Sequence, residues 1–502
     1  MFSRIFRTIH RVLGTLLSIL FLMWFISGIV MIYHRFPSAS QDEKFCKMDV
    51  LSLPMPSADT ILAVRESKFS PDSVGRMALY KYLGETYLEV VDKQEMERGG
   101  RGGFGGRISK FPLDTASAMP QIDGNYIKRV ARLWSSSESD TIVKIDTLNK
   151  LEQWIPFGRL KEEFPIYKFY FADKAATQVY ISSKSGEVLQ CTTRSERFWG
   201  WMGPIPHWVY FTWLRQDVES WKSVIIWLSI FGIIMLISGC YMAIRSFRLS
   251  VKGGRGLASP YKKRWYRWHH IFGTLFGIFV LTWLLSGMYS LAKIPDWLGK
   301  EHKKYSTRGF YASRVKVADF VLDYRRVIAE FDGRVTHISW EGFGEHPYYK
   351  VHLKDGGVEY IDALGNDCSA LYIGEKEAVD AIAPAHLGES YTVELMQQYD
   401  NYYLDIKGRM ELPVWKIAFE NADKSVYYIN PNNGSVRSFN THSRWSFQLY
   451  QGLHSLRYKI FAERKGLWTF VMWFLLLGGA FVSLTGVVLG IRYLLRLLHL
   501  KR

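Results

Sequence analysis

Four long runs of uncharged, mostly apolar residues divide the chain into alternating apolar and polar parts. They cover residues 12–33, 223–244, 271–292 and 467–491. Each reaches the roughly 20 residues that a helix needs to cross ~30 Å of hydrocarbon. The first run has a basic flank like that of a signal peptide, but it is too long for one and no small-residue cleavage site follows it. The pattern therefore predicts four transmembrane helices, of which the first is an uncleaved anchor.

The polar parts between these runs carry the alternation and turn signals of short strands. In the first part, a strand-like run at 164–171 is followed by 179–181 and 187–189, which flank a Ser-Gly turn at 185–186. The second part repeats this with 412–419, 426–429 and 433–436, where the turn is Asn433-Gly434. Two strands around such a turn form a hairpin. Amphipathic helices are expected at 122–134, 315–331 and 374–385. These signals predict an α+β fold with antiparallel sheets and a helix on one face.

The charge of the chain is concentrated beside the apolar runs. Its 502 residues carry a net charge of +17, and three, eight and four Lys or Arg residues lie in segments 1–11, 245–268 and 492–502, which contain no Asp or Glu. Basic residues confined to alternate ends of membrane helices mark cytoplasmic segments. This explains the charge without nucleic acid, so we expect no nucleic-acid partner. Both termini are predicted to be cytoplasmic, with two large external segments.

The second half of the chain repeats the first. His10 and Gly14 open the first apolar run as His269 and Gly273 open the third. Later matches keep one constant offset and include Arg197 with Arg444, His207 with His454, Trp221 with Trp468, and Gly239 with Gly486. We therefore expect two copies, 1–250 and 262–502, joined by a basic linker. Because each copy crosses the membrane twice, the copies share one orientation, as in parallel transporter repeats.

The matched histidines are the candidate chemistry of this protein. The repeat predicts that His10 faces His269 at the cytoplasmic end and that His207 faces His454 at the external end. Facing imidazoles on bundle helices are the geometry of bis-histidine haem, so the sequence predicts two b-type haems (haem b) with these four residues as iron ligands. His270, which matches Arg11, ranks as a backup ligand.

Two glycines support the haem interpretation. A glycine four residues after a histidine lies on the same face of a helix, one turn away. Gly14 and Gly273 hold this position after His10 and His269, and a missing side chain is what a flat macrocycle needs to approach a helix. The alternative is that the four histidines are interfacial residues, His10 and His269 at the headgroups and His207 and His454 in an aromatic belt. Ionisable residues inside membranes are usually functional, which favours ligands.

Several motifs of other redox and nucleotide-binding proteins are absent from the sequence. The glycine-rich run at 99–106 lacks the Gly-Lys-Ser/Thr ending of a phosphate loop and is expected to be a flexible loop. The chain has no GxGxxG after a strand and no CxxCH for covalent haem. Electrons would therefore come from a separate cytoplasmic reductase or a membrane quinol. Cys46 and Cys191 share one external segment, where a disulfide is possible but not established.

The residues resemble the PepSY-associated transmembrane family. The resemblance rests on IHRVLGT…FISG at 9–28, HHIFGT…LLSG at 269–287, FPIYKFYF…VYISSKSGEV at 164–188 and LPVWKIAF…VYYINPNNGSV at 412–436. Some members of that family are bacterial inner-membrane ferric-siderophore reductases with four helices and two b-type haems. The resemblance implies that this protein reduces ferric siderophores or similar iron chelates on the external face.

The expected organisation is a four-helix membrane α+β protein in two parallel-repeat copies, each enclosing a PepSY-like external domain. The parts are a first helix to residue 33, an external domain at 34–221 with a membrane-surface segment near 197–215, a helix at 222–245, a linker at 246–268, a helix at 269–292, an external domain at 293–466, a helix at 467–492 and a tail at 493–502. Two other functions stay open. One is a non-enzymatic scaffold that binds envelope proteins or a transporter. The other is a transporter, although the apolar runs of this chain lack the charged residues that are expected in the middle of the membrane along a substrate path.

Overall fold

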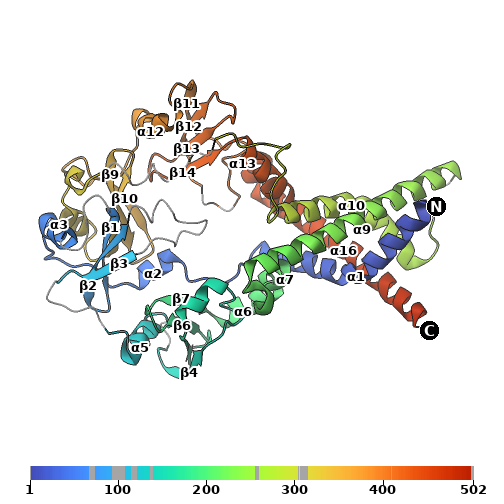
Figure 1. Cartoon of the computed structure of the whole chain (residues 1–502), viewed down its shortest axis with the longest axis horizontal. Coiled ribbons are helices and arrows are strands. Elements are labelled where there is room, and N and C mark those ends of the chain that lie inside the picture. Colours follow the sequence, from blue (N-terminus) through green and yellow to red (C-terminus); the bar gives the residue numbers. More distant parts are fainter. Residues whose placement is uncertain are drawn as a thin grey trace.

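Four long helices form one side of the molecule, and sheets with short helices form the other (Figure 1). The computed structural model of the chain describes residues 2–66, 74–92, 108–114, 121–135, 139–254, 259–303, 305, 315–406, 408 and 410–498. The glycine-rich run at 99–106 lies outside these residues. Within them, four helices are long and apolar enough to cross a membrane: α1 (Phe2–Met31), α9 (Val218–Lys252), α10 (Arg264–Tyr289) and α16 (Lys465–Leu497). The prediction of four helices long and apolar enough to cross a membrane is confirmed.

The four helices pack through aromatic rings seated on glycines. Gly478 and Gly479 of α16 lie directly against Phe276 of α10 and Phe25 of α1, and a Cβ at either glycine would collide with the ring. Small residues at these contacts let helices approach closely, as in membrane bundles. Large apolar side chains also point outward, and Leu16 is 70% exposed. An apolar outer surface on long apolar helices fits a lipid bilayer environment.

Two four-stranded antiparallel sheets follow the predicted hairpins. Their strands are β4 (Ile142–Leu148), β5 (Ile166–Phe171), β6 (Gln178–Ser182) and β7 (Val188–Thr192), and β11 (Tyr391–Met396), β12 (Val414–Phe419), β13 (Val426–Ile429) and β14 (Val436–Phe439). Strand order equals chain order in both. Helix α5 (Gly124–Leu133) packs on the first sheet and α12 (Glu375–Ile382) on the second. The expected α+β architecture is confirmed.

A third sheet is shared by the two segments that lie between the membrane helices. Its order is β10-β9-β8-β1-β2-β3. The strands are β1 (Val74–Tyr82), β2 (Glu85–Asp92), β3 (Ile108–Pro112), β8 (Val335–Phe343), β9 (His346–Leu353) and β10 (Val358–Asp362). Central strands β1 and β8 are antiparallel, with Met77 opposite Trp340 and Tyr80 opposite His337. The sequence assigned a separate domain to each segment, whereas this sheet joins them.

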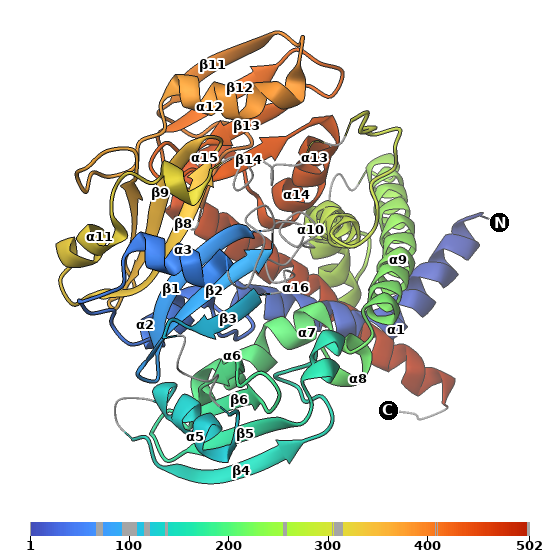
Figure 2. The ribbon, with the colours of Figure 1, turned by 60° about the vertical axis from the view of Figure 1, so that its left-hand side comes forward.

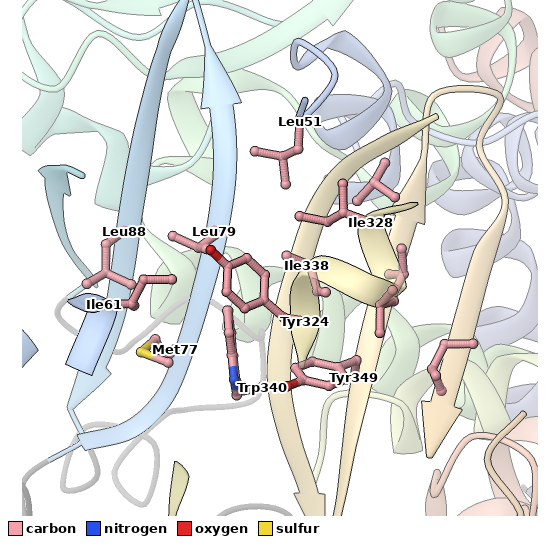
Figure 3. Packing of buried hydrophobic residues seen from close by; sticks show 14 of the residues in the cluster. Leu51, Ile61, Met77, Leu79, Leu88, Tyr324, Ile328, Ile338, Trp340 and Tyr349 are labelled. Atoms are coloured by element: carbon pink, nitrogen blue, oxygen red, sulfur yellow. The ribbon is translucent and has the colours of Figure 1, made fainter. Parts of the chain in front are cut away.

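The joint between β1 and β8 has a continuous apolar core (Figure 3). Leu79 of β1 and Ile338 of β8 are fully buried, and Tyr324 of α11 (Tyr324–Glu330) lies against Trp340. Burying a side chain of this size contributes about 1.5–3 kcal/mol. Helix α3 (Ala58–Glu66) adds Ile61 to the same core. The two halves of the chain are therefore held together outside the helix bundle.

Shorter elements complete the described structure. They are α2 (Gln41–Lys47), η2 (Gly158–Glu163), α6 (Arg194–Met202), α7 (Pro204–Trp208), α8 (Thr212–Arg215), η4 (Val317–Asp319), η5 (Ala383–His386), α13 (Thr441–Ser446), η6 (Phe447–Gly452), α14 (Leu453–Ser455) and α15 (Lys459–Glu463). Helices α7 and α14 lie where the sheets meet the bundle (Figure 2). Cys46 and Cys191 are both free thiols.

Candidate functional site

The structure brings the four matched histidines together as two pairs. His10 of α1 and His269 of α10 have ring centres 6.1 Å apart, and we call them the inner pair. His207 of α7 and His454 of α14 have ring centres 6.2 Å apart and form the outer pair. Both pairings are those expected from the sequence.

Each ring of the inner pair is fixed by a hydrogen bond from Nδ1. His10 Nδ1 lies 3.0 Å from the carbonyl oxygen of Met235, and His269 Nδ1 lies 2.9 Å from Oγ1 of Thr485. The Thr485 hydroxyl donates to the carbonyl of Val482 at 2.8 Å, so its oxygen accepts from the imidazole. Nδ1 therefore carries the proton in both rings, and Nε2 keeps its lone pair.

The outer pair repeats this arrangement. His207 Nδ1 lies 3.1 Å from the carbonyl oxygen of Trp24 and 3.2 Å from Oγ of Ser27. His454 Nδ1 makes the matching contacts with Trp283 and Ser286, both at 3.2 Å. A carbonyl oxygen only accepts, so Nδ1–H donates and Nε2 is again free to bind a metal. Metal-binding histidines usually donate their second nitrogen in this way.

Burial keeps the outer imidazoles neutral. Burial, and then the neighbouring His454, lowers the pKa of His207 to about 4. Burial also lowers the pKa of His454. Both rings are therefore neutral at physiological pH, which is the form that ligates a metal.

Four glycines bring the helix backbones against these rings. A Cβ at Gly28 would lie 3.6 Å from Cε1 of His207, and one at Gly287 would lie 3.5 Å from Cε1 of His454. At the inner pair, a Cβ on Gly239 would come within 2.7 Å of His10, and Gly486 lies beside His269. The sequence contained this signal, because Gly239 matches Gly486 and both apolar runs contain a Ser-Gly pair, at 27–28 and 286–287.

Gly14 and Gly273, which the sequence predicts to leave room for a macrocycle, do not touch the rings. A Cβ on Gly14 would contact Sδ of Met235 at 3.7 Å, and one on Gly273 would have no neighbour within 4 Å among the described residues. Neither glycine packs against an imidazole. The ring of His270 contacts two other aromatic rings, at 5.2 Å from that of Phe247 and 5.3 Å from that of Tyr261.

The outer pair opens into a cavity of about 620 Å³ between the bundle and the short helices. This volume is typical of sites for small molecules and cofactors. Its wall is largely aromatic and aliphatic, with Phe25, Trp283 and Met472 among the lining residues, and it includes Arg35 and Arg457. No group of three or more metal-binding side chains occurs within the described part of the chain. Two imidazoles in an apolar cavity fit a metal whose other ligands belong to a macrocycle.

Comparison of the sequence with known protein families finds no matching family, and comparison with curated proteins finds no relative.

Proposed function

We propose that this protein carries electrons across a membrane on two b-type haems and reduces ferric siderophores or similar iron chelates on the external side. His10 and His269 would hold the inner haem, and His207 and His454 the outer one. The observation that carries the proposal is the pair of facing imidazoles at each site, with every Nδ1 bonded to a neighbouring helix. The resemblance to the PepSY-associated transmembrane family supports the same function.

The distance between the paired rings agrees with ligation of one iron. Histidine nitrogens bind metals at about 2.0 Å, so two imidazoles that would hold one iron must lie close together. The observed separations are 6.1 Å for the inner pair and 6.2 Å for the outer pair. Both sites therefore suit the same bis-imidazole ligation.

The inner pair lies near one end of α1 and α10, and the outer pair contacts these two helices near their other end. His10 belongs to the inner pair, and Ser27, on the same helix α1, contacts the outer pair. A rise of 1.5 Å per residue separates these positions by about 25 Å, most of the ~30 Å of a hydrocarbon layer. The two sites together would cover the insulating part of the membrane.

The protein residues would set the properties of each site. A bound haem supplies a one-electron couple. The Nδ1–H bonds to Met235 and Thr485 fix ring orientation and raise the basicity of Nε2. The outer pair lies in a mainly apolar cavity, and burial of this kind is one of the features that tune a haem potential.

We also propose that the two halves are copies related by a two-fold axis along the membrane normal. Matched contacts support this. Trp221 Nε1 donates to Trp208 and Trp468 Nε1 donates to Ser455, both at 2.8 Å. The residue after each outer histidine helix, Val209 or Leu456, is left-handed. With the basic segments inside, both termini are cytoplasmic and the sheets face the exterior of a bacterial inner membrane.

The experiment that tests this function is the haem content of the purified full-length chain. We expect about two haems per chain by pyridine haemochrome assay, a Soret band, and reoxidation of the reduced protein by a ferric chelate. Donor electrons would come from a cytoplasmic reductase or quinol, so dithionite replaces the donor in this assay. Protein that is colourless after expression in haem-replete cells would instead favour the scaffold function.

A further inference from the structure

Two arginines lie on the wall of the outer cavity. Arg457 follows Leu456, and Arg35 lies just beyond the end of α1. Arg35 is exposed and Arg457 is partly buried, so they occupy the part of the wall that reaches solvent. The remaining wall is mainly apolar. The cavity therefore has an apolar body and a cationic edge.

Three arginines lie close together at this edge, with Asp405 as an acidic neighbour of Arg457. Burial lowers the pKa of Arg457, Asp405 opposes this, and the nearby Arg437 and Arg35 lower it further. Among the described residues, no acidic side chain forms an ion pair with Arg35 or Arg457. One Asp405 oxygen accepts a hydrogen bond from the Met410 amide at 3.0 Å. A partly buried arginine beside other arginines is stabilised by an anion.

The charge also lies on one side of an otherwise matched site. Under the two-copy proposal, the positions equivalent to Arg457 and Arg35 are Tyr210 and Ile294. A flat ligand between His207 and His454 would therefore meet cations along only one of its edges. This favours a ligand whose own anionic groups lie on one edge.

We propose that Arg35 and Arg457 bind the carboxylate side groups of the haem held between His207 and His454, an inference that rests on the proposed function. Haem has an apolar body and carries two carboxylates on one edge, which matches the cavity. Guanidinium groups bind carboxylates through charge-assisted and often bidentate hydrogen bonds. An anionic iron chelate would offer the same carboxylate chemistry, so the experiment separates these two sources.

The test compares two porphyrins in the full-length protein. Wild type, Arg35→Gln, Arg457→Gln and the double variant are produced without haem and titrated with iron protoporphyrin or its dimethyl ester. Wild type should prefer the free acid at the outer site by about tenfold or more, and the double variant should lose this preference. Arg457→Lys should recover part of it. The matched control is Lys459→Gln, because Lys459 is not part of the cavity wall and pairs with Glu463 at 3.7 Å.

A second readout is the midpoint potential of each haem. Removing positive charge beside one haem should lower its potential and leave the other unchanged. A double variant that keeps both potentials and the preference for the free acid overturns the proposal. The proposal is also overturned if the double variant binds haem as the wild type does but no longer reduces ferric citrate. In that case the arginines bind the iron chelate that accepts the electrons. Wild-type protein that binds neither porphyrin overturns the proposed function itself.

Discussion

The ring of His10 lies 6.1 Å from the ring of His269, with the two ring planes inclined by 48°. The planes of His207 and His454 are inclined by 68°. Different helices supply the outer pair and the inner pair, and each ring has its own hydrogen-bond acceptor. The two sites should therefore respond to mutation independently.

Removal of one histidine should empty one site only. His10→Ala or His269→Ala should reduce haem from about two to about one per chain, and His207→Ala or His454→Ala should remove the other haem. Pyridine haemochrome assays and redox titrations of each variant check this.

The control for these variants is His270→Ala, which should keep both haems because the His270 ring contacts Phe247 and Tyr261 instead of the inner pair. Four single variants with full haem content would show that the ligands are assigned wrongly. A loss of haem in His270→Ala would instead indicate that His270 is a haem ligand.

The hydrogen bond from His269 to Thr485 should strengthen the inner site. Thr485→Val keeps the shape of the side chain but removes the acceptor, and such outer-shell changes cost about 10–100-fold in metal affinity. We expect faster loss of the inner haem to apomyoglobin and a raised midpoint potential. Thr469→Val on the same helix is the control, since Thr469 is partly exposed and its hydroxyl donates to the backbone carbonyl of Lys465. Equal haem loss from both variants would contradict this prediction.

Close contact between Gly239 and His10 should make the inner site sensitive to a single methyl group. A Cβ at Gly239 would lie 2.7 Å from Cε1 of His10, so Gly239→Ala should push the ring from its bond with Met235. The inner haem should be lost or become high-spin in its absorption spectrum. Gly466→Ala is the control, because nothing described lies within 4 Å of that Cβ. An unchanged spectrum in Gly239→Ala would show that the ring adapts.

Two histidines of the shared sheet should make it sensitive to acid. Burial lowers the pKa of His352 to about 3, and it also lowers the pKa of His337, which pairs with Tyr80 across the β1–β8 joint. The unfolded chain would bind protons from about pH 6.5 downward that the folded sheet does not, so stability falls as pH drops. Each histidine can contribute about 1.4 kcal/mol per pH unit in this range.

The measurement is hydrogen exchange of the β1 and β8 amides between pH 6.5 and pH 4, corrected for the intrinsic exchange rate. The opening free energy should fall with pH in wild type and fall less steeply in His337→Gln and His352→Gln. Equal slopes in all three proteins would exclude these histidines as the cause.

Hydrophobic periodicity located the membrane helices but not their ends. The apolar run at 223–244 lies inside α9, which extends from Val218 to Lys252. Asp217 caps the start of α9 by accepting hydrogen bonds from the amides of Glu219 and Ser220. Basic residues continue the helix at its other end without contributing to hydropathy. The start of α9 is therefore set by its capping residue, and its other end extends beyond the apolar run because charged residues are tolerated outside the membrane.

Two features of the extramembrane fold were not predicted from the sequence, an interruption of one helix and the shared sheet. The helix expected at 315–331 is interrupted, because the Asp323 side chain accepts from the amide of Arg325 and begins a new helix, α11, at Tyr324. The shared sheet depends on pairing between β1 and β8, which are far apart in sequence. Pairing of this kind leaves no local signal.

The sequence predicted the histidine pairs because the repeat supplied long-range information that a single helix lacks. Helical spacing predicted Gly14 and Gly273 as positions that leave room for a macrocycle, but it did not predict the glycines that touch the rings, which belong to neighbouring helices. Gly28 of α1, for example, contacts His207 of α7. Contacts between helices depend on how the helices pack, and spacing along one helix does not determine them.

The antiparallel joint between β1 and β8 has a consequence for biosynthesis. When β1 emerges during translation, β2 soon covers one of its edges, but β8, its partner on the other edge, has not yet been made, and α9 and α10 precede it. Strand β1 therefore waits as an uncovered edge, the kind of surface that invites mispairing with other chains. The N-terminal half should need chaperone protection until the C-terminal half arrives. Two separately expressed halves should assemble in one cell only when both are present together.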